Sequence, residues 1–337
     1  MSIYNENENE IMEAVKSVLM QTFQDFEIII VHDNPQSPDK KRIIESLKQM
    51  DKRITVIENA NNMGLALSMN KAFKYATGNY IIRMDSDDIS EPTRFQKEID
   101  LLDTQKYDLV FTNYRCINEN GLLLNGGRQT INFDIGGSQL LLQIVFGGII
   151  HHPTVAMTRE IFIKGGTYRN FPCSQDQDLW LRMIECGCRF AYLDEPLLCY
   201  RLRSNSITGN NHLKQYITIT YIIELFIERL KNNGKDSFSN EAYQNYINQR
   251  ISEKQKQSFE RASLFLQKAK TDCNFAMKIV YRSGAFLISK AYRNLFVLKK
   301  RYKKLVLKIE GKNVYDYINH LAEYINKSDT GIISEKT

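Results

Sequence analysis

Three carboxylates fall within four positions of this chain. Asp85, Asp87 and Asp88 follow the apolar stretch "NYIIRM" at residues 79–84. Like charges at this spacing raise one another's pKa and cost stability unless a cation offsets them. Carboxylate oxygens select Mg²⁺ or Mn²⁺, and Mg²⁺ is commonly held by one or two carboxylates together with substrate phosphates. We therefore predict that Asp85 and Asp87 bind a metal and a diphosphate, whereas Asp88 or Ser90 could simply cap the helix that follows.

The elements around these acids predict an α/β domain. Residues 26–33 ("FEIIIVHD") and 53–59 ("RITVIEN") have the apolar runs of buried strands, and 38–50 and 64–78 have the period of amphipathic helices. Such alternation specifies a largely parallel sheet flanked by helices. Ligands bind beyond the carboxyl ends of strands in these sheets, which is where Asp33 and the acids after residue 84 fall.

The second part of the chain has a different pattern. After about residue 212 long helical segments follow one another without convincing strands. We therefore expect a catalytic domain at residues 1–211 and a helical extension at 212–337. The extension is strongly basic at 268–312, where 13 Lys and Arg stand against two acids. That segment carries a net +11 while the whole chain carries +6, so the remaining residues together carry −5.

Apolar residues recur at helical spacing through this basic segment. They are Ile288, Tyr292, Leu295, Tyr302 and Leu305. The pattern fits an interfacial helix lying on an anionic membrane surface, and equally a helix packed on its own domain with a solvated basic face. Nucleic acid is the weaker interpretation, because no recognition motif accompanies the charge. The most apolar windows fall short of the ~20 residues that span a bilayer, and no leader opens the chain, so we expect a cytoplasmic protein.

The cysteines predict no metal site. Six cysteines are scattered along the chain without the spacing of a disulfide framework, and we expect free thiols. Cys186 and Cys188 form a single C-x-C without a second pair, which favours buried small residues over zinc.

Several separated blocks resemble the inverting glycosyltransferases of family 2. The opening "YNENENEIMEAVKSVLMQTFQDFEIIIVHD", the block "NMGLALSMNKAFKYATGNYIIRMDSDD", "HHPTVAM", "DQDLWLRM" and "EPLLCYRLRSNSIT" follow in the family's order over roughly residues 2–206. The resemblance implies the nucleotide-diphospho-sugar transferase fold called GT-A, a Rossmann-like, mostly parallel sheet flanked by helices. It also implies that the segment "MSIYNE" enters near the end of the first strand, and we hypothesise that the natural start lies upstream.

The resemblance assigns roles to particular residues. Asp33 matches the acid that hydrogen-bonds the uracil of a UDP-sugar, with Tyr4 and Glu6 near the nucleotide; a plain turn residue is the alternative for Asp33. Asp85 and Asp87 match the Asp-x-Asp pair, with Asp87 the direct ligand of Mn²⁺ or Mg²⁺. Asp176 matches the general base that takes the proton of the acceptor hydroxyl, so the product has inverted configuration.

Asp176 and three other residues of the family-like blocks each have two interpretations. Asp176 could instead be an acid that satisfies backbone donors at a helix start, and Asp178 is a candidate for that task. Trp180 could stack under an acceptor sugar or belong to the core. His151 and His152 could line the acceptor side or be ordinary loop residues.

The two arginines at the end of the last block also have two interpretations. Arg201 and Arg203 could hold the diphosphate by bidentate contacts or form surface ion pairs.

The sequence thus predicts a metal-dependent transferase that moves a hexose or N-acetylhexosamine from a UDP-sugar to a glycan. The family and the basic segment suggest a polyprenyl-diphosphate-linked acceptor of a bacterial surface polysaccharide, such as O-antigen or capsule, and peripheral contact with the inner face of the cell membrane. Two alternatives remain. A sugar nucleotidyltransferase would carry a Gly-rich basic loop where "YNENENE" stands, and a catalytically silent nucleotide- or membrane-binding protein would not need Asp176.

Overall fold

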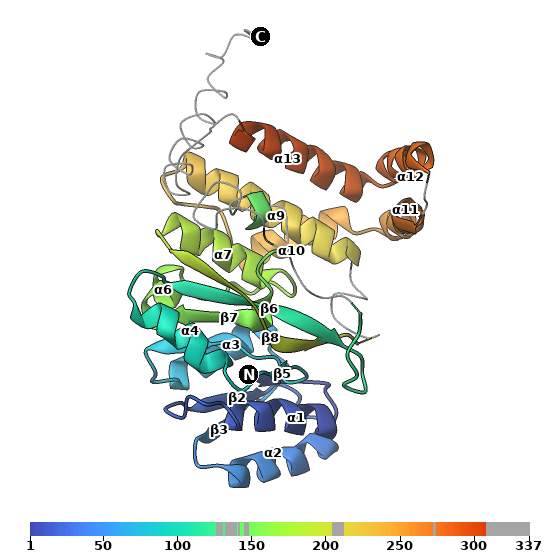
Figure 1. Cartoon of the computed structure of the whole chain (residues 1–337). Helices are drawn as coiled ribbons and strands as arrows, with labels where there is room; N and C mark the ends of the chain where they lie inside the picture. Colours follow the sequence, from blue (N-terminus) through green and yellow to red (C-terminus); the bar gives the residue numbers. More distant parts are fainter. Residues whose placement is uncertain are drawn as a thin grey trace. The chain divides into compact units, whose positions relative to one another are not determined.

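The chain folds as two compact units, Met1–Ser204 and Asn205–Thr337 (Figure 1). The computed structural model describes residues 1–125, 131, 140, 142–144, 148–203, 212–271 and 274–307. The division between the units and the boundary expected at residue 211 both fall in the stretch 204–211, outside the described residues.

The first strands form a parallel sheet in the order β1-β2-β3. Its members are β1 (Ser2–Ile3), β2 (Ile28–His32) and β3 (Ile54–Glu58). The last two lie inside the stretches expected to be strands, and their pairing runs in register from Ile28 opposite Ile54 to His32 opposite Glu58. The carboxyl end of β2 therefore leads directly to Asp33.

Helices cover both faces of β2, which explains its unbroken apolar run. On one face Ile28 and Ile30 pack in a core with residues of α1 (Glu8–Leu19) and α2 (Pro38–Met50). On the other face Ile29 and Val31 pack with Ala72 of α3 (Leu65–Tyr75). The strand is thus the centre of three layers, as the alternating sequence predicts.

A second sheet of five strands follows in the order β4-β7-β6-β8-β5. Its strands are β4 (Tyr80–Ile82), β5 (Ile89–Ser90), β6 (Leu109–Ile117), β7 (Val155–Thr158) and β8 (Phe190–Arg201). Only β6 and β8 pair in parallel, because β7 runs in reverse between β4 and β6, and β5 pairs in reverse with β8. The α/β class is confirmed, and the largely parallel pairing that we expected holds for the first sheet and for one pair of the second.

Four further helical segments surround this sheet. They are α4 (Arg94–Asp103), the 3₁₀ turn η1 (His152–Thr154), α6 (Arg159–Lys164) and α7 (Gln175–Glu185). Helix α4 packs on the sheet through Leu102, which clusters with Val110, Ala156 and Ala191. The five cysteines of the described residues form no disulfide bond.

The second unit is helical in its described residues. Its helices are α9 (His212–Lys231), α10 (Asn240–Arg250), α11 (Glu253–Thr271), α12 (Phe275–Ile288) and α13 (Lys290–Leu307). No helix within the described ranges is long and apolar enough to cross a bilayer.

The apolar positions of α13 mostly face inward. Leu295 and Tyr302 are 3% and 4% exposed, and the Tyr292 ring lies 6.4 Å from that of Tyr216 in α9. The side chain of Leu305 lies outside the described residues. Of the two interpretations kept for this stripe, packing on its own domain therefore holds for Leu295 and Tyr302 of α13.

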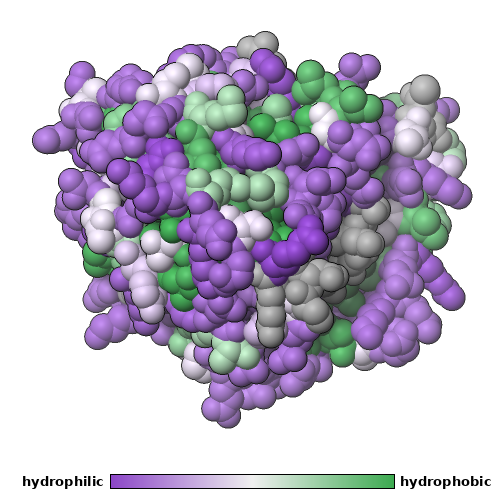
Figure 2. Space-filling model, turned by 90° about the horizontal axis from the view of Figure 1, so that it is seen from below, coloured by the Kyte–Doolittle hydropathy of each residue, from purple (hydrophilic) through white to green (hydrophobic). Residues whose placement is uncertain are grey.

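The side of the molecule that carries α2 is mainly hydrophilic. Figure 2 shows this face as mostly polar, with hydrophobic residues in small scattered groups. Isolated apolar residues of this kind are normal on a protein surface.

Candidate active site

The three acids come together at the end of β4. Each of Asp85, Asp87 and Asp88 offers a carboxylate oxygen, and the three oxygens lie within 4.8 Å of one another. Asp88 is fully buried, and its Oδ2 has no hydrogen-bond partner among the described residues. A hard divalent cation would satisfy that oxygen and offset the charge, so these residues fit Mg²⁺ or Mn²⁺.

Electrostatics around Asp87 support the same conclusion. Burial, together with the charges of Asp85, Glu6 and Glu10, raises the pKa of Asp87 to about 7 against the lowering effect of Arg203. Burial together with Asp85 and Asp87 also raises the pKa of Asp88 well above its usual range. The site therefore carries more negative charge than its own cations balance.

Two arginines partly compensate this charge. The Arg83 guanidinium, which is buried, pairs with Asp85. Arg203 lies between two acids, with Nη1 3.5 Å from Asp87 Oδ2 and Nε 3.7 Å from Glu10 Oε1. Arg203 thus reaches Asp87, for which the sequence predicts metal binding.

Glu10 is held in place by a capping box at the start of α1. The Asn7 side chain accepts a 3.0 Å bond from the Glu10 N–H, and the Asn7 N–H donates a 2.8 Å bond to Glu10 Oε2. The other carboxylate oxygen of Glu10 is the one that faces Arg203. The capping box at the start of α1 thereby fixes the Glu10 carboxylate next to Arg203 at the acidic site.

Arg201 anchors the acidic turn. Its Nε donates to the Asp87 carbonyl at 2.7 Å, its Nη2 to Glu13 at 2.7 Å, and its Nη1 to the carbonyls of Asn118 and Glu119. The side chain is 1% exposed. Because these partners occupy the guanidinium, the ion-pair interpretation holds for Arg201, and diphosphate contact by Arg203 stays a prediction.

A buried ion pair holds the backbone just after β4. Arg94 Nε donates to Glu98 Oε1 at 2.9 Å, and Arg94 Nη2 donates to the Arg83 carbonyl at 3.1 Å. Both side chains are fully buried, and burial raises the pKa of Glu98 to about 7. Arg94 thereby positions the backbone that enters the acidic turn.

Asp33 lies at the carboxyl end of β2, where its carboxylate already accepts hydrogen bonds. Its Oδ1 accepts from Asn59 Nδ2 and from the Met63 N–H, both at 2.7 Å, and its Oδ2 accepts from the Gly64 N–H at 2.8 Å. Gly64 has a φ of 81° and precedes α3. Asp33 thus shapes the loop before α3, while its contact with uracil remains a prediction.

Tyr4 and Glu6 lie just after β1. The Tyr4 N–H donates to Glu6 Oε2 at 2.7 Å, and Asn34 Nδ2 donates to the Tyr4 carbonyl at 3.1 Å. The Tyr4 side chain is 40% exposed, and the charge of Glu6 acts on Asp87. Glu6 therefore borders the acidic site, and the exposed Tyr4 is tied to Glu6 through its backbone N–H.

Asp176 comes to this site from the first turn of α7. Ser174, directly before the helix, has a left-handed φ of 57°. Burial raises the pKa of Asp176, the N–H groups of Gln177 and Asp176 oppose that rise, and the charges of Arg83 and Asp85 also act on it. The fold thus brings Asp176 within electrostatic range of residues more than 90 positions earlier.

Asp178 has a different environment on the same helix. It is fully buried, accepts a 2.9 Å bond from Arg182 Nε and lies 3.7 Å from Arg169 Nη1. Arg182 Nη2 in turn donates to the Thr167 carbonyl at 2.7 Å. Asp178 therefore holds the preceding loop through arginines, whereas Asp176 accepts hydrogen bonds from the backbone N–H groups of Gln177 and of Asp176 itself.

The surroundings of the acidic site also include two aromatic residues, Tyr114 and Tyr200, that the sequence did not single out. Tyr114 lies 4.2 Å from the His151 ring and 5.9 Å from the Tyr200 ring, between centroids. The charges of Asp85, Asp88 and Asp87 reach Tyr200 and, with burial, raise its pKa. Burial lowers the pKa of His151 to about 4, so its imidazole is neutral at physiological pH.

His152 and Trp180 belong to the interior. His152 Nε2 lies 2.7 Å from the Tyr168 hydroxyl, and its ring centroid lies 6.1 Å from that of Trp180. Trp180 is 2% exposed. Trp180 therefore belongs to the core and does not stack under an acceptor sugar, which was its other interpretation.

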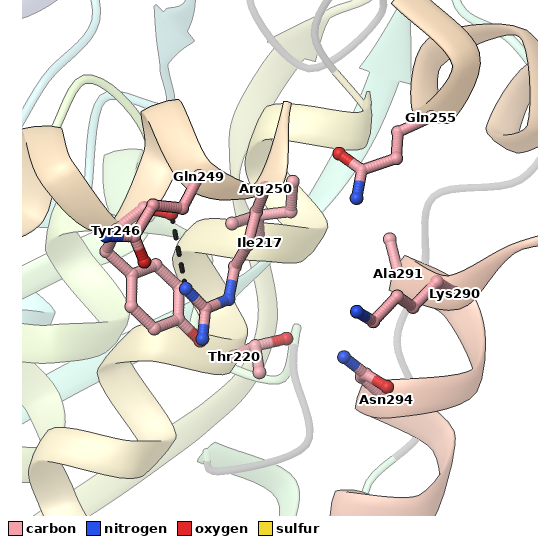
Figure 3. A pocket seen from close by; sticks show the side chains of 9 residues that line it. All are labelled: Ile217, Thr220, Tyr246, Gln249, Arg250, Gln255, Lys290, Ala291 and Asn294. Carbon is pink, nitrogen blue, oxygen red and sulfur yellow. Dashed lines mark hydrogen bonds between the residues drawn. The ribbon is translucent and has the colours of Figure 1, made fainter. Parts of the chain in front are cut away.

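A polar cavity lies in the second unit and lacks catalytic groups. It measures about 280 Å³ and is lined by Thr220, Tyr246, Arg250, Gln255, Lys290 and Asn294 among others (Figure 3). The Arg250 guanidinium stacks 3.5 Å from the centre of the Tyr246 ring and donates to the Tyr246 carbonyl. The described residues that line this cavity include no carboxylate, thiol or imidazole. The acidic site is therefore the better candidate for the active site.

The family model for glycosyl transferase family 2 matches residues 1–166. The glycosyltransferase MJ1057 of Methanocaldococcus jannaschii is 33% identical over 220 residues, which cover 64% of this chain and 74% of that protein. The O-antigen biosynthesis glycosyltransferase WbnJ of Escherichia coli is 28% identical over 218 residues, 64% of this chain and 83% of its own length. The amylovoran biosynthesis glycosyltransferase AmsE of Erwinia amylovora is 26% identical over 68% of this chain and 85% of its own length.

Two solved structures have the same fold at low identity. TarS 1-349 of S. aureus, in complex with UDP-GlcNAc, superposes with a TM-score of 0.57 at 13% identity, covering 99% of this chain and 91% of that one. The mannosyltransferase PcManGT of Pyrobaculum calidifontis, in complex with GDP-Man and Mn²⁺, gives 0.50 at 13% identity, covering 97% and 86%. At this identity the likeness shows the fold, and the predicted GT-A architecture is confirmed.

Proposed function

Since this chain belongs to glycosyltransferase family 2 and is a glycosyltransferase, we propose that it transfers a hexose or N-acetylhexosamine from a UDP-sugar to a glycan, with inversion of configuration. The observation that carries the proposal is the cluster of Asp85, Asp87 and Asp88 with Asp176 in electrostatic range of it. Because the chain belongs to this family, the sugar nucleotidyltransferase alternative is excluded. The presence of Asp176 favours an active enzyme over a catalytically silent binding protein, which would not need this residue.

We assign the donor nucleotide to the edge formed by Tyr4, Glu6 and Asp33. The open ring of Tyr4 offers a stacking surface for a base, and the Asp33 carboxylate retains acceptor capacity beyond its three bonds. The UDP-GlcNAc bound to TarS favours a uridine nucleotide, whereas PcManGT is bound to GDP-Man. Arg203 would contact the diphosphate next to Asp87.

Asp85 and Asp87 would hold the divalent ion, with Asp88 beneath them. When bound, Mn²⁺ or Mg²⁺ offsets the charge of the diphosphate and of the departing UDP. The Mn²⁺ in the PcManGT structure supports manganese as one candidate. Arg83 and Arg203 contribute fixed positive charge on either side of the same acids.

Asp176 acts as the general base in this proposal. Its carboxylate takes the proton from the acceptor hydroxyl while the hydroxyl oxygen bonds to the anomeric carbon, and the bond from that carbon to UDP breaks on the opposite face. The proton stays on Asp176 and the electron pair leaves with UDP. Burial raises the pKa of Asp176, which makes the carboxylate a better proton acceptor than a solvated aspartate.

The acceptor that we propose is lipid-linked, as a polyprenyl-diphosphate oligosaccharide would be. WbnJ and AmsE are named for the biosynthesis of O-antigen and amylovoran, both polysaccharides, which supports a bacterial surface polysaccharide as the product. The basic segment at 268–312 would bring the enzyme to the cytoplasmic face of the membrane, where such an acceptor resides.

Hydrolysis of a panel of UDP-sugars tests this function. We expect slow UDP release from one donor with Mn²⁺ or Mg²⁺, loss of release in EDTA, and loss in Asp87→Ala. Glu160→Gln is the matched control, because Glu160 is an exposed carboxylate that pairs with Lys164 within α6. If no donor in the panel is bound or hydrolysed, or if Asp87→Ala keeps full activity, the proposed function is wrong.

A further inference from the structure

Helix α12 turns a stripe of large apolar side chains outward. Phe275 and Leu287 are 76% and 73% exposed, and Ile279 and Val280 are 50% and 55% exposed. At 3.6 residues per turn these four positions share one face of the helix, with only Ser283 as a polar residue among them. Most amphipathic helices of a globular protein turn such a face toward the core.

Packing on neighbouring helices fixes this orientation. Ala285 on the opposite side of α12 is fully buried, and a Cβ on Gly284 would come within 3.0 Å of the Phe265 ring of α11. Tyr281 also meets Phe265, with ring centroids 6.1 Å apart. The close approach at Gly284 locks α12 against α11, so the apolar stripe has to face away from it.

The stripe lies on a cationic part of the sequence. Residues 274–307, which form α12 and α13, contain nine Lys and Arg and no Asp or Glu. Among them, Arg282, Lys290, Lys300 and Lys303 are exposed. Next to the stripe, α13 exposes Phe296 and Val297 at 45% and 52%. The surface therefore combines apolar side chains with unbalanced positive charge.

We propose that the apolar stripe of α12 inserts into the interface of an anionic membrane, flanked by the cations of α12 and α13. Anionic headgroups complement the charge, and the acyl boundary takes the apolar side chains. A second copy of this chain would place two cationic surfaces against each other, and charge repulsion opposes that pairing. The proposal deepens the proposed function, because it names the element that would hold the enzyme at the site of a lipid-linked acceptor.

This mode of binding differs from a purely electrostatic one. High salt screens the attraction between cations and headgroups, but it does not weaken the burial of apolar side chains. Wild-type protein should therefore bind anionic vesicles less tightly in high salt and still bind them measurably.

Vesicle flotation with the full-length chain tests the proposal. The vesicles contain phosphatidylcholine alone or equal parts of phosphatidylcholine and phosphatidylglycerol. The triple variant Phe275→Ser, Ile279→Ser, Leu287→Ser should bind the anionic vesicles at least about tenfold more weakly than wild type. The control Met20→Ser, Tyr75→Ser, Ile163→Ser removes three apolar side chains that are 54–71% exposed in the first unit and should bind as wild type does.

Two further readouts keep the result interpretable. UDP-sugar hydrolysis and thermal melting should be unchanged in the triple variant, so failure of membrane binding and failure of the proposed function are told apart. The proposal is overturned if the triple variant binds as wild type, or if high salt abolishes wild-type binding. It is also overturned if light scattering shows a wild-type dimer that the triple variant dissociates.

Discussion

The backbone N–H of Arg201 donates a 2.8 Å hydrogen bond to Oδ1 of Asp88, which lies 113 positions earlier in the chain. This bond joins the end of β8 to the acidic turn after β4. The Arg201 side chain reinforces the junction through the Asp87 carbonyl and Glu13. Asp88 thus has one oxygen committed to the fold and one left for a cation.

Substitutions at Asp88 should separate these two roles. In EDTA, Asp88→Ala leaves the buried Arg201 N–H without an acceptor and should lower the free energy of unfolding by about 1–3 kcal/mol. Asp88→Asn keeps an acceptor oxygen and removes a buried charge, so it should be at least as stable as wild type at neutral pH. Urea denaturation of both variants measures the difference, and equal stabilities would contradict the role of this bond.

Stability without metal should fall as pH rises toward neutrality. Asp87 has a folded-state pKa of about 7, above its unfolded value near 3.8, and that of Glu98 is also about 7. The folded state therefore binds more protons than the unfolded state between these values, so the free energy of unfolding decreases with pH across this window. Thermal melts in EDTA from pH 4 to about pH 8 measure the trend.

Metal should reverse the part of this effect that comes from the acidic site. At a concentration about 100 times its dissociation constant, a bound ion stabilises the folded state by about 2.7 kcal/mol. Asp87→Asn should lose most of this stabilisation and should flatten the pH dependence, leaving the contribution of Glu98. A gain in melting temperature with Mn²⁺ that persists in Asp87→Asn would place the ion elsewhere.

The two acids of α7 should respond differently to the same substitution. Asp176→Asn removes the proposed proton acceptor and should lower turnover by about 10²–10⁴-fold, with UDP affinity and melting temperature retained. Asp178→Asn leaves Arg182 and Arg169 with weaker partners inside the protein, so it should lower the melting temperature. Calorimetric UDP binding and single-turnover UDP release distinguish these outcomes, and unchanged turnover in Asp176→Asn would remove it as the base.

The buried pair Arg94 and Glu98 should behave as a unit. Arg94→Met leaves an uncompensated buried carboxylate and should cost about 3–5 kcal/mol of unfolding free energy. The double variant Arg94→Met, Glu98→Leu should recover most of that loss, though not the hydrogen bond to the Arg83 carbonyl. A double-mutant cycle in denaturant measures the coupling, and additive losses would show that the two side chains act independently.

The sequence alone determined the local elements and the chemistry of one strand end. The unbroken apolar run at residues 28–31 predicts a buried strand, and the acids at 85–88 predict a cation site, because both properties depend on residue types that are close in the chain. The order of the family motifs added the fold and the identity of Asp176 as a candidate base.

Only the tertiary structure decided which surfaces and partners these elements have. Periodicity shows that α13 buries one face and that α12 has an apolar face. It does not show that packing on α11 turns the apolar face of α12 outward. Likewise, nothing local indicates that Arg201 would anchor the acidic turn or that Tyr200 would lie in range of its charges. The relationships of Arg201 and Tyr200 arise from contacts between segments more than 80 positions apart, which a pattern of neighbouring residues does not encode.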